Sequence, residues 1–115
     1  MQFIALIYNT EGNDDVEWET LTQQYGEFGA DLSKSGAMLG GEALQPISTS
    51  TSVQVRDGKT LVTDGPFAET KEQLGGFYLM DCKDLDEAIK WAAKIPTARY
   101  GTIEVRPIIM FDEEH

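Results

Sequence analysis

Residues 64–77 read DGPFAETKEQLGGF and combine turn-forming and titratable residues more densely than any other part of the chain. Asp64 can hydrogen-bond its own turn, and the glycine and proline after it suit a positive φ and a fixed φ. Phe67 is expected to anchor this loop in the core. Two further glycines close the stretch and lead into an apolar run. We therefore predict a defined turn that joins a β-hairpin to the strand after it.

Strand-like composition recurs on both sides of this stretch. Residues 2–8 are rich in β-branched and aromatic types and carry apolar side chains on both faces of the predicted strand. Asp57-Gly58 lies between two short β-type runs, which is a strong hairpin signal. Gly40-Gly41 predicts a bulge or a close backbone approach. The predicted strands are residues 2–8, 38–44, 77–80 and 103–110, and the predicted hairpin joins residues 51–55 to 59–63.

Two segments show the period of amphipathic helices. The first begins near Asp14, with an acidic residue three positions later as in a capping box, and ends at Gly36. The second repeats that start at Asp84 and stops before Pro96. The predicted apolar stripes are Trp18, Leu21, Tyr25, Phe28 and Leu32 in the first helix, and Leu85, Ala88, Ile89, Ala92 and Ile95 in the second.

The order of these elements is strand, helix, strand, inserted hairpin, strand, helix, strand. This is the split βαβ pattern of a ferredoxin-like α+β fold, which we assign to a single domain over residues 1–115 with both helices on one sheet face. Two helices cover only one face, and three of the strands are apolar on both. The uncovered face is therefore expected to pack on a second copy, which predicts a homodimer joined sheet to sheet.

Composition narrows the classes of function. Twenty acidic residues against nine basic ones give a net charge of −11, with no cluster of lysine or arginine. Nucleic acids and anionic membranes both require a basic surface, so neither is an expected partner. The longest apolar run, residues 3–8, is too short to span a bilayer, and no basic leader precedes it, so we expect a cytoplasmic protein. Cys82 is the one cysteine, and with no histidine beside it an activated thiol is not expected.

Several segments together carry a family resemblance. They are Asp64-Gly65-Pro66-Phe67, Glu69, Lys71, Glu72, Gly75-Gly76-Phe77, Gly36, Gly40-Gly41, the strand at 3–8 and Glu104-Val105-Arg106-Pro107. The chain resembles the DGPF-domain branch of the YCII-related proteins over essentially its whole length. The resemblance implies a βαββαβ fold with an inserted β-hairpin, assembled as a dimeric α+β barrel, and a biochemical role that is unassigned for most members.

The resemblance also implies two directions for function. Relatives in the wider superfamily include a dehydrochlorinase of chlorinated hydroxyquinols, proposed to use a His–Asp pair, and cofactor-free oxygenases of small molecules. Some DGPF-bearing proteins are associated with extracytoplasmic-function sigma factors, which implies regulation. This chain departs from the catalytic relatives, because its only histidine is the last residue, His115. A terminal side chain is hard to hold in fixed geometry, so neither His–Asp chemistry nor a His-based metal site is expected.

Asp64 is the first candidate for chemistry, as a general base or a ligand acceptor at the mouth of a cleft. Turn chemistry explains every residue type around it, so the structural interpretation is preferred. Glu69 and Glu72 would share one face of a helical turn beside Lys71, and paired acids can be tuned for proton transfer. The lysine opposes that tuning, and a solvated charged turn is the simpler interpretation.

Arg106 and Tyr8 are the other candidates. The planar guanidinium of Arg106 suits a ligand carboxylate or phosphate, whereas pairing with Glu104 or with an acid of the 64–72 loop across a dimer seam is the preferred alternative. The Tyr8 hydroxyl could reach the same cleft, or the ring could simply pack at its rim. The sequence has no phosphate-binding glycine loop, nucleophile elbow or metal-spaced His/Cys set, so neither cofactor nor metal is predicted.

Two classes of function follow. The first is a small-molecule-binding or regulatory homodimer whose pocket lies between helices and sheet or at the dimer seam. The second is a cofactor-independent enzyme, dehydrochlorinase-like or oxygenase-like, that acts on a small aromatic acid with Asp64 as base and Arg106 as anion anchor. The missing histidine favours the first class. The residues predicted to line the site are Tyr8, Asp64, Phe67, Glu69, Lys71 and Arg106.

Overall fold

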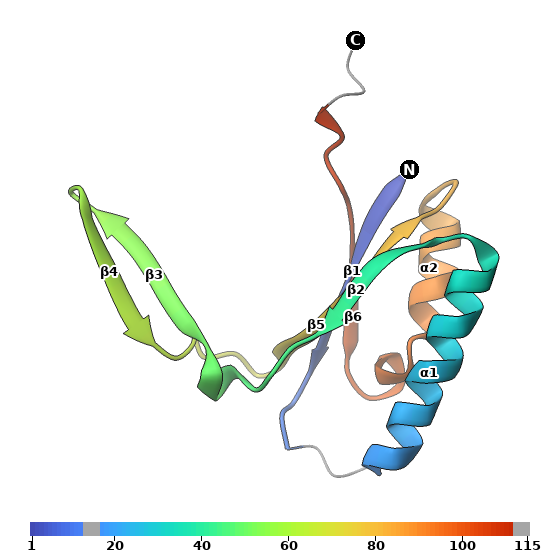
Figure 1. Ribbon diagram of the computed structural model, residues 1–115, viewed down its shortest axis with the longest axis horizontal. Coiled ribbons are helices and arrows are strands. Elements are labelled where there is room, and N and C mark those ends of the chain that lie inside the picture. Colours follow the sequence, from blue (N-terminus) through green and yellow to red (C-terminus); the bar gives the residue numbers. More distant parts are fainter. Residues whose placement is uncertain (13–16, 112–115) are drawn as a thin grey trace.

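A computed structural model describes residues 1–12 and 17–111, so Asp14 and His115 lie outside the described residues. The strands β1 (Gln2–Asn9), β2 (Met38–Ala43), β5 (Gln73–Asp81) and β6 (Thr102–Pro107) form one sheet, and the helices α1 (Trp18–Ser35) and α2 (Leu85–Lys94) complete the body. The strand order is β2-β5-β1-β6, and every neighbouring pair is antiparallel. Both helices lie on the same side of the sheet (Figure 1). The predicted ferredoxin-like α+β fold is confirmed.

The core lies between the sheet and the two helices. Alternation along β1 turns Phe3, Ala5 and Ile7 toward the helices, and all three are buried. Met80 of β5 pairs with Phe3 and is fully buried beside it. The rest of this core comes mainly from Phe28, Leu32, Ala37, Cys82, Ala88 and Ile95. A single compact core of this size is what a chain of this length can build.

The helix ends follow the sequence closely, but the apolar stripes do so only in part. Gly36 ends α1 with a φ of 86°, and the Asp84 side chain caps α2 by accepting a hydrogen bond from the Glu87 amide at 2.9 Å. Trp18 was predicted to lie on the buried stripe, but it is 78% exposed. It occupies the first turn of α1, which extends past the end of the sheet (Figure 1).

The stripe of α2 is also narrower than predicted. Leu85 and Ile89 are each about half exposed, while Ala88 and Ala92 are buried. The helix therefore meets the sheet through its alanines, and the larger residues flank the contact. Small side chains at the contact allow the helix and the sheet to approach closely.

The predicted hairpin forms a separate two-stranded sheet. Its strands are β3 (Thr51–Arg56) and β4 (Lys59–Asp64), and a short 3-10 helix, Ile47–Thr49, precedes them. Asp57 and Gly58 both have positive φ, at 53° and 75°, as a tight two-residue hairpin turn requires. We call residues 51–64 the arm. The arm projects away from the body, on the side of the sheet opposite the helices (Figure 1).

Two strand boundaries differ from the prediction because pairing, rather than composition, sets them. The last strand was predicted to run to residue 110, but it ends at Pro107, which pairs with Phe3 near the start of β1. Beyond that point β1 offers almost no backbone to pair with. The strand predicted at 77–80 instead begins at Gln73, because the end of β1 continues the ladder. The predicted irregularity at Gly40 is confirmed as a register shift in β2.

Candidate functional site

The sheet face that the helices leave uncovered carries two of the six predicted site residues, Tyr8 and Arg106. The second set of alternating positions on β1 points to this side, together with their paired neighbours on β5. We call it the open face. Its apolar centre consists of Ile4, Leu6, Tyr8, Leu74, Phe77 and Leu79, none of which belongs to the helix-side core. The prediction that three strands are apolar on both faces is therefore confirmed for β1 and β5. It is wrong for β6, whose side chains on this face are polar.

Polar side chains flank this apolar centre on the outer strands. Thr102, Glu104 and Arg106 follow one another at alternate positions of β6, opposite Tyr8, Leu6 and Ile4 of β1. On the other edge, Glu42 of β2 pairs with Phe77. The pairing register aligns residues of the four strands into rows that cross the sheet. Each row is written in the strand order β6, β1, β5, β2. The row Glu104-Leu6-Phe77-Glu42 has an acid at each end, whereas the row Arg106-Ile4-Leu79-Gly40 contains no acid at all.

Arg106 has no carboxylate partner in the described part of the protomer. The one ion pair there joins the Met1 amino group to Asp81, and Arg106 and Glu104 do not pair with each other. The guanidinium is exposed at the edge of the open face, beside Ile4. A planar cation next to apolar surface suits the carboxylate or phenolate of a ring compound. The row Arg106-Ile4-Leu79-Gly40 is therefore the candidate site.

Tyr8 and Arg106 share the open face but lie at opposite ends of it. Tyr8 pairs with Thr102, whereas Arg106 pairs with Ile4. Four residues along a strand correspond to about 13 Å. The two side chains therefore do not line one small pocket within a protomer.

Asp64 and Phe67 lie away from this face, at the foot of the arm. Gly65 takes a φ of 98°, its amide donates to the Ser50 carbonyl at 2.8 Å, and its carbonyl accepts from the Ser52 hydroxyl at 2.7 Å. The predicted turn is confirmed, and it closes the arm. Phe67 does not anchor it, because the side chain is 88% exposed. The Asp64 carboxylate is exposed and accepts no hydrogen bond within the described ranges.

The helical turn expected around Glu69 and Glu72 does not form. The Thr70 hydroxyl donates to the Glu72 backbone carbonyl at 2.6 Å, and the side-chain Nε2 of Gln73 donates to the Thr70 backbone carbonyl at 2.7 Å. This compact loop points Glu69 and Lys71 into solvent. Glu72 accepts a 2.8 Å hydrogen bond from the Thr102 hydroxyl at the end of the sheet. Side-chain bonds to the backbone thus replace the predicted helix.

The sequence analysis did not predict a role for Thr102 or for Gln73, although each forms a hydrogen bond near the end of the sheet. The Gln73 side-chain oxygen accepts from the Glu11 amide at 2.9 Å, and so joins the loop after β1 to the loop before β5. The position of Thr102 could have been read from the sequence, because it lies two residues before Glu104 on the same face of one strand. No comparable pattern marks Gln73, because its partner lies across the sheet end.

A shallow groove of about 210 Å³ lies between the two helices on the other side of the molecule. It holds no predicted site residue. The Lys94 ammonium group lies 4.9 Å from the centre of the Trp91 ring, and Phe28 meets that ring edge-on. The lining residues are Gln24, Glu27, Phe28, Asp31, Trp91, Lys94, Pro96 and Arg99. Acids and bases alternate here, so the groove has no clear preference for a ligand charge.

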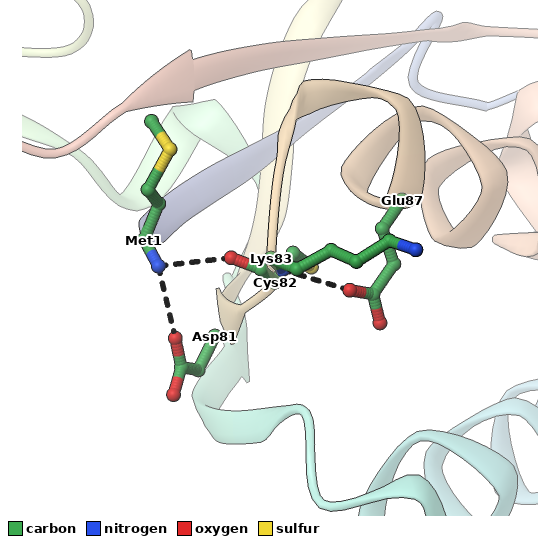
Figure 2. Close-up of polar contacts among 5 residues, drawn as sticks. All are labelled: Met1, Asp81, Cys82, Lys83 and Glu87. Atoms are coloured by element: carbon green, nitrogen blue, oxygen red, sulfur yellow. Dashed lines mark hydrogen bonds and ion pairs between the residues drawn. The ribbon is translucent and has the colours of Figure 1, made fainter.

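The single cysteine lies near the start of β1, where the backbone is tied together at several points. The Met1 amino group donates to the Cys82 carbonyl at 2.9 Å, and the Lys83 amide donates to Glu87 at 2.8 Å (Figure 2). Burial raises the pKa of the Cys82 thiol, and the negative charges of Glu87 and Asp81 raise it further. An unreactive thiol follows, as predicted.

Two kinds of feature are absent from the described residues. Across residues 1–12 and 17–111, no three side chains of the histidine, cysteine or acidic types gather as metal ligands. None of the described helices combines the length and the apolar character needed to cross a bilayer.

The sheet order, with both helices on one face, defines a ferredoxin-like α+β domain. The chain belongs to the YCII-related domain family, which matches residues 1–112. It is similar to the uncharacterized protein R00369 of Rhizobium meliloti (strain 1021), with 47% identity over 70 residues. That match covers 59% of this chain and 56% of the relative, so it spans little more than half of the relative's length.

A solved structure shares the fold. It is 5-chloro-2-hydroxyhydroquinone dehydrochlorinase (TftG) from Burkholderia phenoliruptrix AC1100, in complex with 2,5-dihydroxybenzoquinone. The TM-score is 0.54 at 14% sequence identity, and the match covers 95% of this chain and 94% of the other. At that identity the likeness concerns the fold alone.

Proposed function

We propose that this domain works as a homodimer whose two open faces pack together and hold a small aromatic acid at their edge. One observation carries the proposal. The central strands β1 and β5 are apolar on both sides, but the protomer supplies helices for only one side. Burial of the second side against an identical face follows the same principle that placed the helices on the first.

The ligand class follows from the row that contains Arg106. An aromatic ring would lie over Ile4 and Leu79, and its acidic group would meet the guanidinium. Gly40 leaves space at the far end of the row, because a Cβ there would meet only a Leu79 methyl group at 3.8 Å. The neighbouring row has acids at both ends and would repel an anion. Recognition of an aromatic carboxylate or phenolate is therefore confined to one end of the open face.

A thermal-shift screen tests this proposal. The purified protein would be heated with benzoates, hydroxyquinols, dihydroxybenzoquinones and phosphorylated metabolites, and the screen repeated on Arg106→Ala. A ligand at a hundred times its dissociation constant adds about 2.7 kcal/mol of stability, which raises the unfolding midpoint measurably. We expect ring acids to give a shift that is lost in Arg106→Ala and retained in Arg99→Ala, a matched control on the helix side. A shift that survives Arg106→Ala would refute this site.

The enzyme alternative requires turnover that depends on Asp64. An acid/base enzyme would consume its substrate, and Asp64→Asn would abolish that turnover while the fold survived. A binding domain would show the ligand shift without any product. Chromatography of each ligand that gives a shift, after incubation with the wild type and with Asp64→Asn, separates the two functions.

A further inference from the structure

The arm is the one large part of the fold that lacks a packing partner. Its strands pair only with each other, and every arm residue except Ser52 is exposed. A two-stranded hairpin alone in water is marginally stable. The radius of gyration reflects this projection, because it is 16.3 Å against about 13 Å for a compact domain of this length. A structured arm of this kind indicates that something outside the protomer covers it.

One side of the arm carries three exposed valines along its middle. Val53 pairs with Val62, and Val55 pairs with Thr60, so these side chains share one face. Val53 is 61% exposed, Val55 is 59% exposed and Val62 is 63% exposed. Phe67, immediately beyond the foot, adds an exposed aromatic ring of the kind that anchors protein interfaces. The valine face is defined here as Val53, Val55 and Val62.

The foot of the arm is closed by its own hydrogen bonds, and one more hydrogen bond joins it to the body. The Gly65 bonds to Ser50 and Ser52 close the two strands at their base. The Glu11 carboxylate accepts from the Ile47 amide at 2.8 Å and holds the segment that enters the arm. Of these bonds, the one between Ile47 and Glu11 joins the arm's entry segment to the loop after β1. The arm leaves the body in a definite direction in the structure (Figure 1). Figure 1 shows that this direction is toward the side of the sheet opposite the helices, which is the side of the open face.

Charge and area both favour a second copy of this chain as the occupant. The arm tip carries Arg56 and Lys59 against Asp57, a net charge of +1 in a chain of −11, which leaves −12 on the rest. Attraction between a cationic tip and an acidic body assists that approach. The open face offers six apolar side chains on β1 and β5, with Thr102, Glu104, Arg106 and Glu42 on the outer strands. A stable interface buries about 800 Å² on each partner, which corresponds to about 20–30 residues, so a sheet-to-sheet contact needs further surface.

We propose that each arm clasps the other protomer of the homodimer, with its valine face against that protomer's body. The inference rests on the sheet-to-sheet homodimer of the proposed function and assigns the arm to it. A copy packed on the open face would lie beside the arm, which already extends to that side. The clasp buries the valines, and it places the Asp64-Gly65-Pro66-Phe67 loop at the seam between the copies.

Intermolecular paramagnetic broadening tests the clasp directly. A nitroxide would be attached to Gln54→Cys on the arm, in a Cys82→Ala background, and this protein mixed with isotope-labelled protein that lacks the nitroxide. Amide signals in the labelled copies report only contacts between different chains. We expect broadening over one contiguous surface of the body. A nitroxide at Lys90→Cys, an exposed position on α2, is the matched control and should leave that surface sharp.

The outcomes separate the two proposals. Val53→Lys combined with Val62→Lys should remove the broadening and weaken dimerisation about tenfold or more, while the helix content of the body stays unchanged. If sedimentation shows a dimer but the arm nitroxide broadens no signal in the other copy, the clasp is wrong, the homodimer stands and the arm faces a different partner. If sedimentation shows only monomer, the homodimer and the clasp both fail.

Discussion

The two faces of the four-stranded sheet are built from the same strands, but only one of them is covered. On β1, Phe3, Ala5 and Ile7 are buried under the helices, while Ile4, Leu6 and Tyr8 on the alternate positions are only partly shielded, by their neighbours in the sheet. On β1 and β5 the side chains of both faces are apolar, whereas the outer strands β6 and β2 place polar side chains on the uncovered face. The number of helices, rather than the strand composition, leaves one face without cover. An apolar face of this kind indicates the need for a partner.

The contrast between the two faces also separates the residues that stabilise a single protomer from those that we expect to be buried only when a second copy binds. We call the helix-covered side of the sheet the closed face, and the core between it and the helices contains all of the fully buried large side chains among the described residues. The apolar side chains of the open face are half-buried, and the arm and Phe67 add five exposed ones, namely Val53, Val55, Leu61, Val62 and Phe67. Substitutions on the closed face should therefore act at every protein concentration. Substitutions on the open face should act only where copies associate.

Truncation of neighbouring β5 side chains should show the largest contrast between the faces. Met80→Ala removes a fully buried side chain from the closed face and should cost about 2–5 kcal/mol of unfolding free energy. Leu79→Ala removes its neighbour from the open face and should cost less than about 1 kcal/mol in dilute solution. Denaturant unfolding at low and high protein concentration measures both. A Leu79→Ala cost independent of concentration would count against association through this face.

Two adjacent glycines of β2 give a smaller and more local contrast. A Cβ on Gly41 would lie 2.7 Å from the Phe77 carbonyl oxygen and 2.8 Å from the Tyr78 ring, so Gly41→Ala should destabilise the protein by about 1–3 kcal/mol. Gly40→Ala faces only the Leu79 methyl group at an ordinary contact distance and should be close to neutral. Thermal unfolding of the two variants, at matched concentrations, checks the difference. Equal costs would contradict the assigned packing of the two faces.

Alkaline pH should weaken the closed face gradually. Burial raises the pKa of Tyr25, and a hydrogen bond to Thr97 offsets only part of that rise. Burial also raises the pKa of Tyr78. The folded state therefore favours the neutral phenols, while tyrosines in the unfolded chain ionise near pH 10. The stabilising contribution is complete below that pH and is lost as the pH rises toward the higher folded values. Denaturant unfolding between neutral and strongly alkaline pH measures the loss, which Tyr25→Phe should reduce.

The sequence predicted the fold well because its signals were local. The alternation in residues 2–8, the Asp57-Gly58 turn and the Asp84 cap are each decided by a few neighbouring residues, and the structure confirms all three. The strand order follows from them, because short connections and two helices leave few alternatives. Strand ends were less accurate, because the length of β1 sets where β6 stops.

The candidate site was harder to predict because it depends on where segments lie in space. The residue types of the 64–67 turn were interpreted correctly, but nothing local shows that Phe67 faces solvent, or that the arm leaves the body instead of folding over it. Glu69 and Glu72 have the i, i+3 spacing of a helical turn, but the side-chain hydrogen bonds of Thr70 and Gln73 form a different loop there. The separation of Tyr8 from Arg106 is known only once the strand register is known.

Sedimentation equilibrium over a series of protein concentrations, for the wild type and for Leu6→Lys, tests the central claim most directly. Leu6 lies in the middle of the open face, and a lysine there would place a charge in the proposed interface without touching the helix-side core. The account predicts that the wild type has twice the mass of one chain at micromolar concentration. It predicts a folded monomer for Leu6→Lys, with dimerisation weakened about a hundredfold. A wild type that stays monomeric throughout, or a Leu6→Lys variant that associates as tightly as the wild type, would contradict it.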